Sequence, residues 1–151
     1  NPKVFDIAHR FLPNLFHINW IHHIITLSFL APLLFYPNIY FEYSKYWVVI
    51  FIIRSIIIVV TVLPKYKECD ISGPDVLLSG GCYDKVFSGH FASVLLATML
   101  YSKYNLIAPN TFFLINFINA FFILATRSHY TIDIFVAIFV TLYVYQSNLI
   151  K

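Results

Sequence analysis

The stretch that decides the fold is the C-terminal run LIAPNTFFLINFINAFFILATRSHYTIDIFVAIFVTLYVYQSN, residues 106–148. It holds two apolar segments, 106–126 and 130–148, separated by a short polar break at 127–129. Each segment has close to the roughly 20 residues that a helix needs to cross a bilayer. Because the break is short, we expect the two helices to be antiparallel neighbours.

Similar apolar runs occur upstream, over 20–36, 46–64 and 88–103. Of the 151 residues, 60% are hydrophobic and 11% are charged, which is more apolar surface than a water-soluble domain of this size can hide. We therefore predict an all-α, polytopic membrane helix bundle of about five spans, forming a single domain over residues 1–151. Nucleic acid is excluded as a partner, because the net charge of +3 is small and dispersed.

The parity of five crossings places the start of the chain, the loop 65–87 and the turn 127–129 on one membrane face. This face carries most of the lysines and arginines, so the positive-inside rule would make it cytosolic. Cys69 and Cys82 argue the other way, because a disulfide between them would require a lumenal or exterior loop. Two unrelated free thiols are the alternative.

His129 and Asp133 are four residues apart at the start of the last predicted helix, so they share one helix face. The carboxylate can then accept a hydrogen bond from the imidazole. A histidine oriented in this way can act as a nucleophile or a general base. A structural ion pair is the alternative.

The string Phe87-Ser88-Gly89-His90 opens the predicted helix 88–103. Ser88 can cap this helix, Gly89 permits close backbone approach, and the free amides of the first turn can bind a phosphate oxygen. A simple helix cap is the alternative. Together with His129 on the same face, His90 suggests phosphoryl transfer, in which one imidazole attacks phosphorus and the other protonates the leaving oxygen.

Three cations are candidate phosphate ligands. Arg54 places a guanidinium inside the predicted helix 46–64, where it could grip phosphate with two hydrogen bonds or pair with a carboxylate such as Asp133. Lys85 and Arg127 are further candidates, with interfacial anchoring as the alternative.

Other polar residues of the predicted spans receive a structural interpretation. Asn116 and Asn119 are interpreted as hydrogen-bond donors between helices. His17, His22 and His23 flank the first predicted helix and are interpreted as surface histidines.

Three strings resemble motifs of the sphingomyelin synthase family, within the phosphatidic-acid phosphatase type 2 superfamily. Residues 82–90, CYDKVFSGH, look like the family's C-G-D-x-x-x-S-G-H motif, and residues 129–133, HYTID, look like its H-Y-T-x-D motif. Residues 54–64 fit its R-x(6)-T-x-L-P string. Tyr83 stands where the family has glycine, and the loop before Cys82 is shorter than in typical members.

The resemblance implies a fold of six helices, of which the first would be absent here. It implies His129 as nucleophile, Asp133 as its orienting partner and His90 as acid and base. Substrate binding would involve the remaining motif residues and nearby cations, which are Arg54, Asp84, Lys85, Ser88, Gly89, Arg127 and Tyr130. Choline could be held by an aromatic ring such as that of Tyr83 or Tyr130, with Asp84 nearby.

The expected reaction is transfer of a phosphocholine or related head group from a phospholipid donor to a ceramide acceptor through a phosphohistidine, without a metal or cofactor. The expected place is the Golgi or plasma membrane, with the active site facing the lumen or exterior, and a homo-oligomer is left open. The rivals are a lipid phosphatase or hydrolase, a non-catalytic lipid-binding protein and a His/Asp metal site.

Overall fold

The computed structural model describes residues 5–61 and 85–147, in which every regular element is a helix. The predicted all-α class is therefore confirmed for these residues. In chain order the elements are α1 (Ile7–Phe11), η1 (Phe16–Ile18), α2 (Trp20–Leu30), η2 (Ala31–Phe35), α3 (Pro37–Val60), α5 (Gly89–Lys103), α6 (Pro109–Ala125) and α7 (Thr131–Gln146), where η denotes a 3-10 helix.

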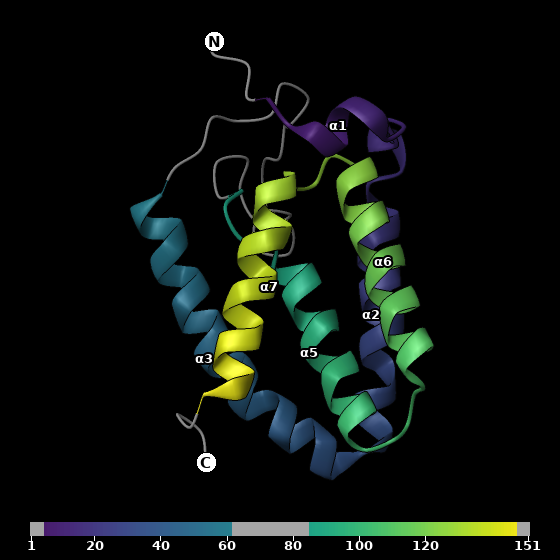
Figure 1. The fold of residues 1–151 in the computed structure, drawn as a ribbon, viewed down its shortest axis with the longest axis vertical. Coiled ribbons are helices and arrows are strands. Elements are labelled where there is room, and N and C mark those ends of the chain that lie inside the picture. The colour runs from purple at the N-terminus through teal and green to yellow at the C-terminus, as the bar shows by residue number, and fades with distance from the viewer. Residues whose placement is uncertain (1–4, 62–84, 148–151) are drawn as a thin grey trace.

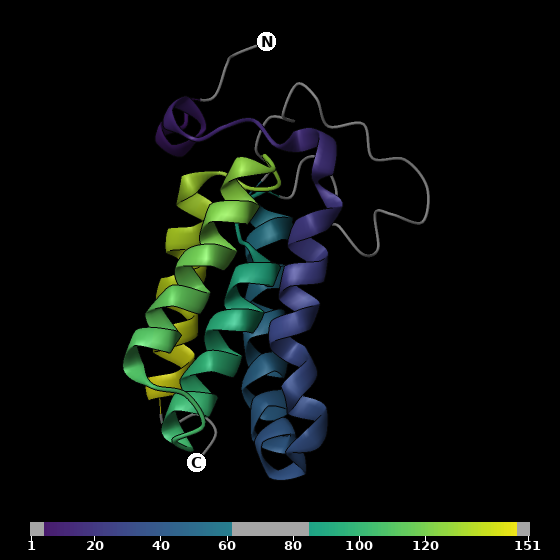
Figure 2. The same cartoon turned by 90° about the vertical axis from the view of Figure 1, so that its right-hand side faces the viewer.

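Helix α5 lies at the centre of the bundle and packs against α2, α3, α6 and α7. The longer helices run along the long axis of the molecule, and α1 lies across one end of the bundle (Figures 1 and 2). The residues of α5 from Phe91 to Thr98 are all buried, and Ala92, Ser93 and Ala97 are among them. Small side chains let neighbouring helices approach closely, which suits this segment to the central position.

The predicted helix 46–64 is wrong at its start, because α3 begins at Pro37. Proline is favoured in the first turn of a helix, where no amide hydrogen is required. Glu42, a charged residue before the predicted start, lies within the helix and has hydrogen-bond partners. Glu42 accepts a hydrogen bond from Lys103 Nζ at 2.6 Å and another from Tyr104 Oη at 2.8 Å. At its other end α3 stops at Val60, and residues 62–64 lie outside the described residues.

The other predicted helices are found with shifted ends. The segment 20–36 divides into α2 and η2, because Pro32 cannot continue the α-helical hydrogen bonding. Helix α5 begins one residue after Ser88, whose side chain caps it by accepting a hydrogen bond from Phe91 N at 3.3 Å. The predicted spans 106–126 and 130–148 correspond to α6 and α7.

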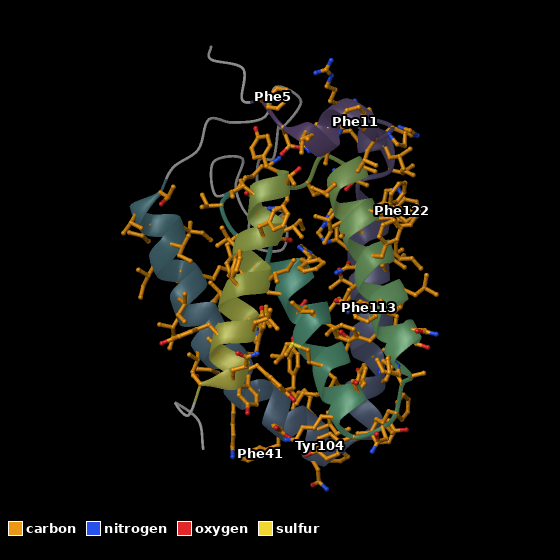
Figure 3. The ribbon with its side chains drawn as sticks, in the orientation of Figure 1. Phe5, Phe11, Phe41, Tyr104, Phe113 and Phe122 are labelled. Atoms are coloured by element: carbon orange, nitrogen blue, oxygen red, sulfur yellow. The ribbon has the colours of Figure 1, made fainter. Side chains whose placement is uncertain are left out.

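Within the described ranges, α3 is the one helix long and apolar enough to cross a membrane. Shorter apolar segments cover Trp20–Phe35, Pro109–Ala125 and Thr131–Gln146. Phe113 projects from α6 with 68% of its surface exposed, and Phe139 of α7 is exposed to a similar degree (Figure 3). Asn119 and Thr141, on the same two helices, are fully buried. Apolar side chains outside and polar ones inside reverse the usual distribution of water-soluble helices.

The buried amides of α6 donate to α5, as predicted. Asn116 Nδ2 donates to Thr98 Oγ1 at 2.9 Å, and Asn119 Nδ2 lies 3.5 Å from the carbonyl oxygen of His90. Asn119 therefore supports the backbone at the first turn of α5.

The N-terminal segment is bound to the end of the bundle where α7 begins. Asp6 Oδ2 accepts a hydrogen bond from Thr131 N at 2.6 Å, and Oδ1 accepts from Thr131 Oγ1 and from His9 N, both at 3.0 Å. Leu15 N donates to Ala125 O at 2.8 Å. Asp6 thus connects α1 to the first turn of α7, in addition to capping α1 itself.

Replacing Asp6 with alanine is expected to lower the free energy of unfolding by about 2 to 4 kcal/mol, because three donors lose a charged acceptor in a partly buried site. The thermal unfolding midpoint of the purified chain in detergent measures this loss. Arg10→Ala, an exposed change on the same helix, is the control. An Asp6→Ala midpoint equal to that of Arg10→Ala would contradict the assigned role.

Candidate active site

The start of α7 holds the histidine–carboxylate pair that the sequence predicted, with Asp133 in the first turn and His129 two residues before the helix begins. His129 Nδ1 lies 2.9 Å from Asp133 Oδ2, which also accepts a hydrogen bond from Tyr130 N at 2.9 Å. Asp133 is fully buried, and His129 is 7% exposed. Since the carboxylate can only accept, Nδ1 of His129 carries the hydrogen, and in the neutral ring Nε2 keeps its lone pair.

The first turn of α5 lies against the first turn of α7. Ser88 N donates to the backbone oxygen of Asp133 at 3.3 Å, which fixes the starts of the two helices together. The two histidines that the sequence singled out therefore lie at one end of the bundle, as the parity of the predicted helices required.

Arg54 reaches this end from α3. A Cβ atom placed on Gly89 would lie 3.2 Å from Arg54 Nε, so the guanidinium group packs directly on the glycine at the start of α5. The close approach that was expected of Gly89 is thus made by an arginine side chain.

Lys85 and Arg127 are also at the histidine end, and both are buried and hydrogen-bonded to backbone. Lys85 Nζ donates to Arg127 O at 3.0 Å, and Arg127 Nη2 donates to Leu12 O at 3.0 Å. Arg127 has a φ of 58°, a left-handed conformation in the turn between α6 and α7. Both cations therefore help to hold this turn and the N-terminal segment.

Tyr130 and His9 cover the pair from the N-terminal side. Their ring centroids are 5.4 Å apart, and His9 Nε2 donates to His129 O at 2.9 Å. Burial lowers the pKa of His9 below its ordinary value of 6.5 and outweighs the opposite effect of Asp6. The neutral ring is suited to this bond with a carbonyl oxygen. Sequence reasoning did not identify His9 as part of the site.

The interpretation of His22 and His23 as surface histidines is wrong. His22 is 4% exposed, and its Nδ1 lies 3.1 Å from Ser128 Oγ. His23 Nδ1 lies 2.8 Å from His90 Nε2, so one of these two nitrogens donates to the other. The sequence did contain a signal for this contact. His22 and His23 are adjacent near the start of an apolar helix, on the same predicted membrane face as His90. His17, by contrast, is exposed.

Four residues of the sequence predictions lie outside the described residues. Asp84 was predicted to bind substrate, Tyr83 stands at the departure from the family motif, and Cys69 and Cys82 were the candidate disulfide. Their predictions stay open.

The comparisons with known proteins bear on the C-terminal part of the chain. Residues 81–149 match a family model described as PAP2 superfamily C-terminal. The matched residues include His90, His129 and Asp133. No curated protein matches the chain, and no solved structure matches it. The family match supports the PAP2 superfamily to which the sequence motifs pointed, without distinguishing its branches.

Proposed function

We propose that this chain, whose residues 81–149 match the PAP2 superfamily, is a membrane-embedded transferase that moves a phosphorylated head group between lipids. The superfamily suggests lipid phosphatase or phosphotransferase activity. The finer proposal is transfer of phosphocholine, or a related head group, from a glycerophospholipid to ceramide. The observation that carries it is the His129–Asp133 hydrogen bond at 2.9 Å, beside the start of the helix that bears His90.

In the proposed first step, His129 Nε2 attacks the phosphorus of a phosphatidylcholine-like donor. Asp133 holds the Nδ1 hydrogen and stabilises the positive charge that develops on the ring. The bond from phosphorus to the glycerol oxygen breaks, and protonated His90 gives its proton to that oxygen. Diacylglycerol leaves, and the head group stays on His129 as a phosphohistidine.

In the second step, neutral His90 removes the proton from the primary hydroxyl of ceramide. The ceramide oxygen attacks phosphorus, and the bond from phosphorus to Nε2 of His129 breaks. His90 ends protonated, which is the state that begins the next cycle. The contact of 2.8 Å between His23 Nδ1 and His90 Nε2 gives the His90 ring a hydrogen-bond partner between these two proton transfers.

Arg54 and the amides at the start of α5 are the proposed ligands of the phosphate oxygens. The guanidinium group packs on Gly89, beside the amides of the first turn of α5, which have no carbonyl partner within the helix. A fixed positive charge and oriented amides stabilise the negative charge that builds up on a phosphoryl group under attack. Lys85 and Arg127 add positive charge at the turn between α6 and α7, which their hydrogen bonds hold in place.

The exposed apolar side chains support a place within the membrane. Phe5 and Phe11 lie at the histidine end of the bundle, and Phe41 and Tyr104 lie at the opposite end (Figure 3). Aromatic rings at both ends are typical of the two head-group layers of a bilayer. The proposed location is an endomembrane or the plasma membrane, with the histidine end facing the lumen or exterior.

A lipid phosphatase or hydrolase is the second candidate, since water could take the place of ceramide in the second step. The same residues would form the same phosphohistidine, so the acceptor distinguishes the two activities.

The test supplies phosphatidylcholine labelled in its choline to the purified chain in vesicles, with and without ceramide. The proposal expects labelled sphingomyelin only when ceramide is present. Labelled phosphocholine in water would indicate the hydrolase instead. Donors with ethanolamine or inositol head groups, assayed in parallel, define the head group. The absence of any labelled product from all three donors would reject both activities.

A further inference from the structure

Three imidazole rings from two helices converge beside the site. His22 and His23 come from α2 and His90 comes from α5. The ring centroids of His22 and His23 are 4.0 Å apart. The centroid of the His90 ring lies 4.9 Å from that of His22 and 4.7 Å from that of His23. One ring nitrogen of each lies within 4.8 Å of the other two. The sequence motifs and the proposed transfer give no role to the cluster as a whole.

The separations between these nitrogens are compatible with a shared metal ion. In a tetrahedral zinc site the metal–nitrogen distances of about 2.0 to 2.1 Å place the ligand nitrogens about 3.3 Å apart. The contact of 2.8 Å between His23 and His90 and the upper limit of 4.8 Å lie on either side of this value. Small rotations of the rings are therefore enough to form the site.

The surroundings of His22 orient its ring in the way that metal sites require. Its Nδ1 lies 3.1 Å from Ser128 Oγ and 3.5 Å from Thr126 Oγ1, two hydroxyl groups at the turn between α6 and α7. Thr126 Oγ1 donates to Phe122 O at 2.7 Å and can therefore accept from Ser128 Oγ at 3.0 Å. This leaves Ser128 Oγ to accept from Nδ1 of His22. With the hydrogen on Nδ1, the other nitrogen, Nε2, is available as a ligand. His22 is also buried, so the ring is held in place by packing.

We propose that His22, His23 and His90 form a binding site for a transition metal ion of the Zn²⁺ class, and that the bound ion inhibits the enzyme. Imidazole ligands suit Zn²⁺, Co²⁺, Ni²⁺ and Cu²⁺, whereas Mg²⁺ and Ca²⁺ require oxygen ligands. The ion replaces the hydrogen bond between His23 and His90. The ring that donated that bond moves its hydrogen to its other nitrogen, so no net proton is released.

Inhibition follows because Nε2 of His90, the nitrogen that contacts His23, cannot be protonated while it holds the ion, and the first step of the transfer requires protonated His90. This part of the inference rests on the proposed function, in which His90 is the acid and base. The binding of metal does not rest on it, and the two are measured separately.

The binding experiment uses the full chain in detergent, stripped of metal with a chelator and then titrated with Zn²⁺ alone. We expect saturation at about one ion per chain and a weakening of at least about 10-fold in His22→Gln and in His23→Gln. His17→Gln, an exposed histidine on η1, is the matched control and should bind as the unchanged chain does. Co²⁺ should give the visible absorption of a tetrahedral site, and Mg²⁺ should not compete.

At one fixed concentration, zinc should also raise the thermal unfolding midpoint of the unchanged chain and of His17→Gln by more than that of the two cluster variants. The midpoint without zinc also identifies a variant that binds weakly only because it folds poorly. Absence of saturable binding, or equal affinity in all variants, would overturn the site.

The activity arm separates the two proposals. In the labelled-lipid assay, Zn²⁺ should suppress product formation and a chelator should restore it. An inactive chain that still binds zinc through these histidines would reject the proposed function and leave the metal site standing. If the chain is active and saturating zinc leaves its product formation unchanged, the proposed inhibition is rejected.

Discussion

Replacement of His129 by glutamine is expected to lower head-group transfer by about 10⁴-fold or more, because in the proposed mechanism the covalent bond to phosphorus forms on the His129 ring. Glutamine cannot replace the Nε2 lone pair that the Asp133 hydrogen bond leaves on the ring. The initial rate of labelled product formation at saturating donor measures the loss. The same change should also abolish acid-labile labelling of the protein when the acceptor is withheld.

His17→Gln is the matched control, since it makes the same chemical change at an exposed position at the same end of the bundle. It should retain the activity of the unchanged chain. Circular dichroism of both variants checks that the helices are intact. If the rate of lipid turnover by His129→Gln lies within about 10-fold of the rate of the control, His129 is not the nucleophile.

Replacement of Asp133 by asparagine is expected to lower the rate by about 10³ to 10⁴-fold while leaving the fold in place. The side-chain oxygen of asparagine can still accept from Tyr130 N, so the cap of α7 is retained. The negative charge that stabilises the developing imidazolium is lost, and the ring is free to adopt the other tautomer. Activity and thermal stability, measured on one preparation, separate these effects.

The expected signature is a fall in kcat with a nearly unchanged KM, because in the proposed mechanism the carboxylate acts on the lipid only through the histidine that it contacts. Asp133→Ala removes the cap as well and should therefore unfold at a lower temperature than Asp133→Asn. Equal losses of stability in both variants, with activity proportional to the folded fraction, would assign Asp133 a structural role alone.

The sequence predicted the central pair because helical spacing is local information. The spacing of four residues predicted that His129 and Asp133 would share a helix face. In the structure His129 precedes the N-cap residue Tyr130, and it reaches Asp133 across the cap of α7 and not along the helix. The start of α5 was predicted for a similar reason, since Ser88 is a cap and Gly89 follows it. Parity alone placed His90 and His129 at the same end.

The contacts that escaped prediction join residues far apart in the chain. Asp6 and Thr131 are 125 positions apart, and His23 and His90 are 67 apart. Such pairs depend on which helices are neighbours, and a single sequence does not determine that order. The start of α3 was missed for another reason. Glu42 looks like a loop residue until Lys103 and Tyr104 are placed beside it.

The attachment of the N-terminal segment also has a practical consequence. Asp6 and Leu15 are hydrogen-bonded beside the start of α7, so a fusion partner joined before α1 would emerge next to the histidines and crowd the approach of lipid. Helix α7 runs from that end to the far end of the bundle, where it ends at Gln146 (Figure 1). Purification handles and fluorescent reporters are therefore better attached after α7.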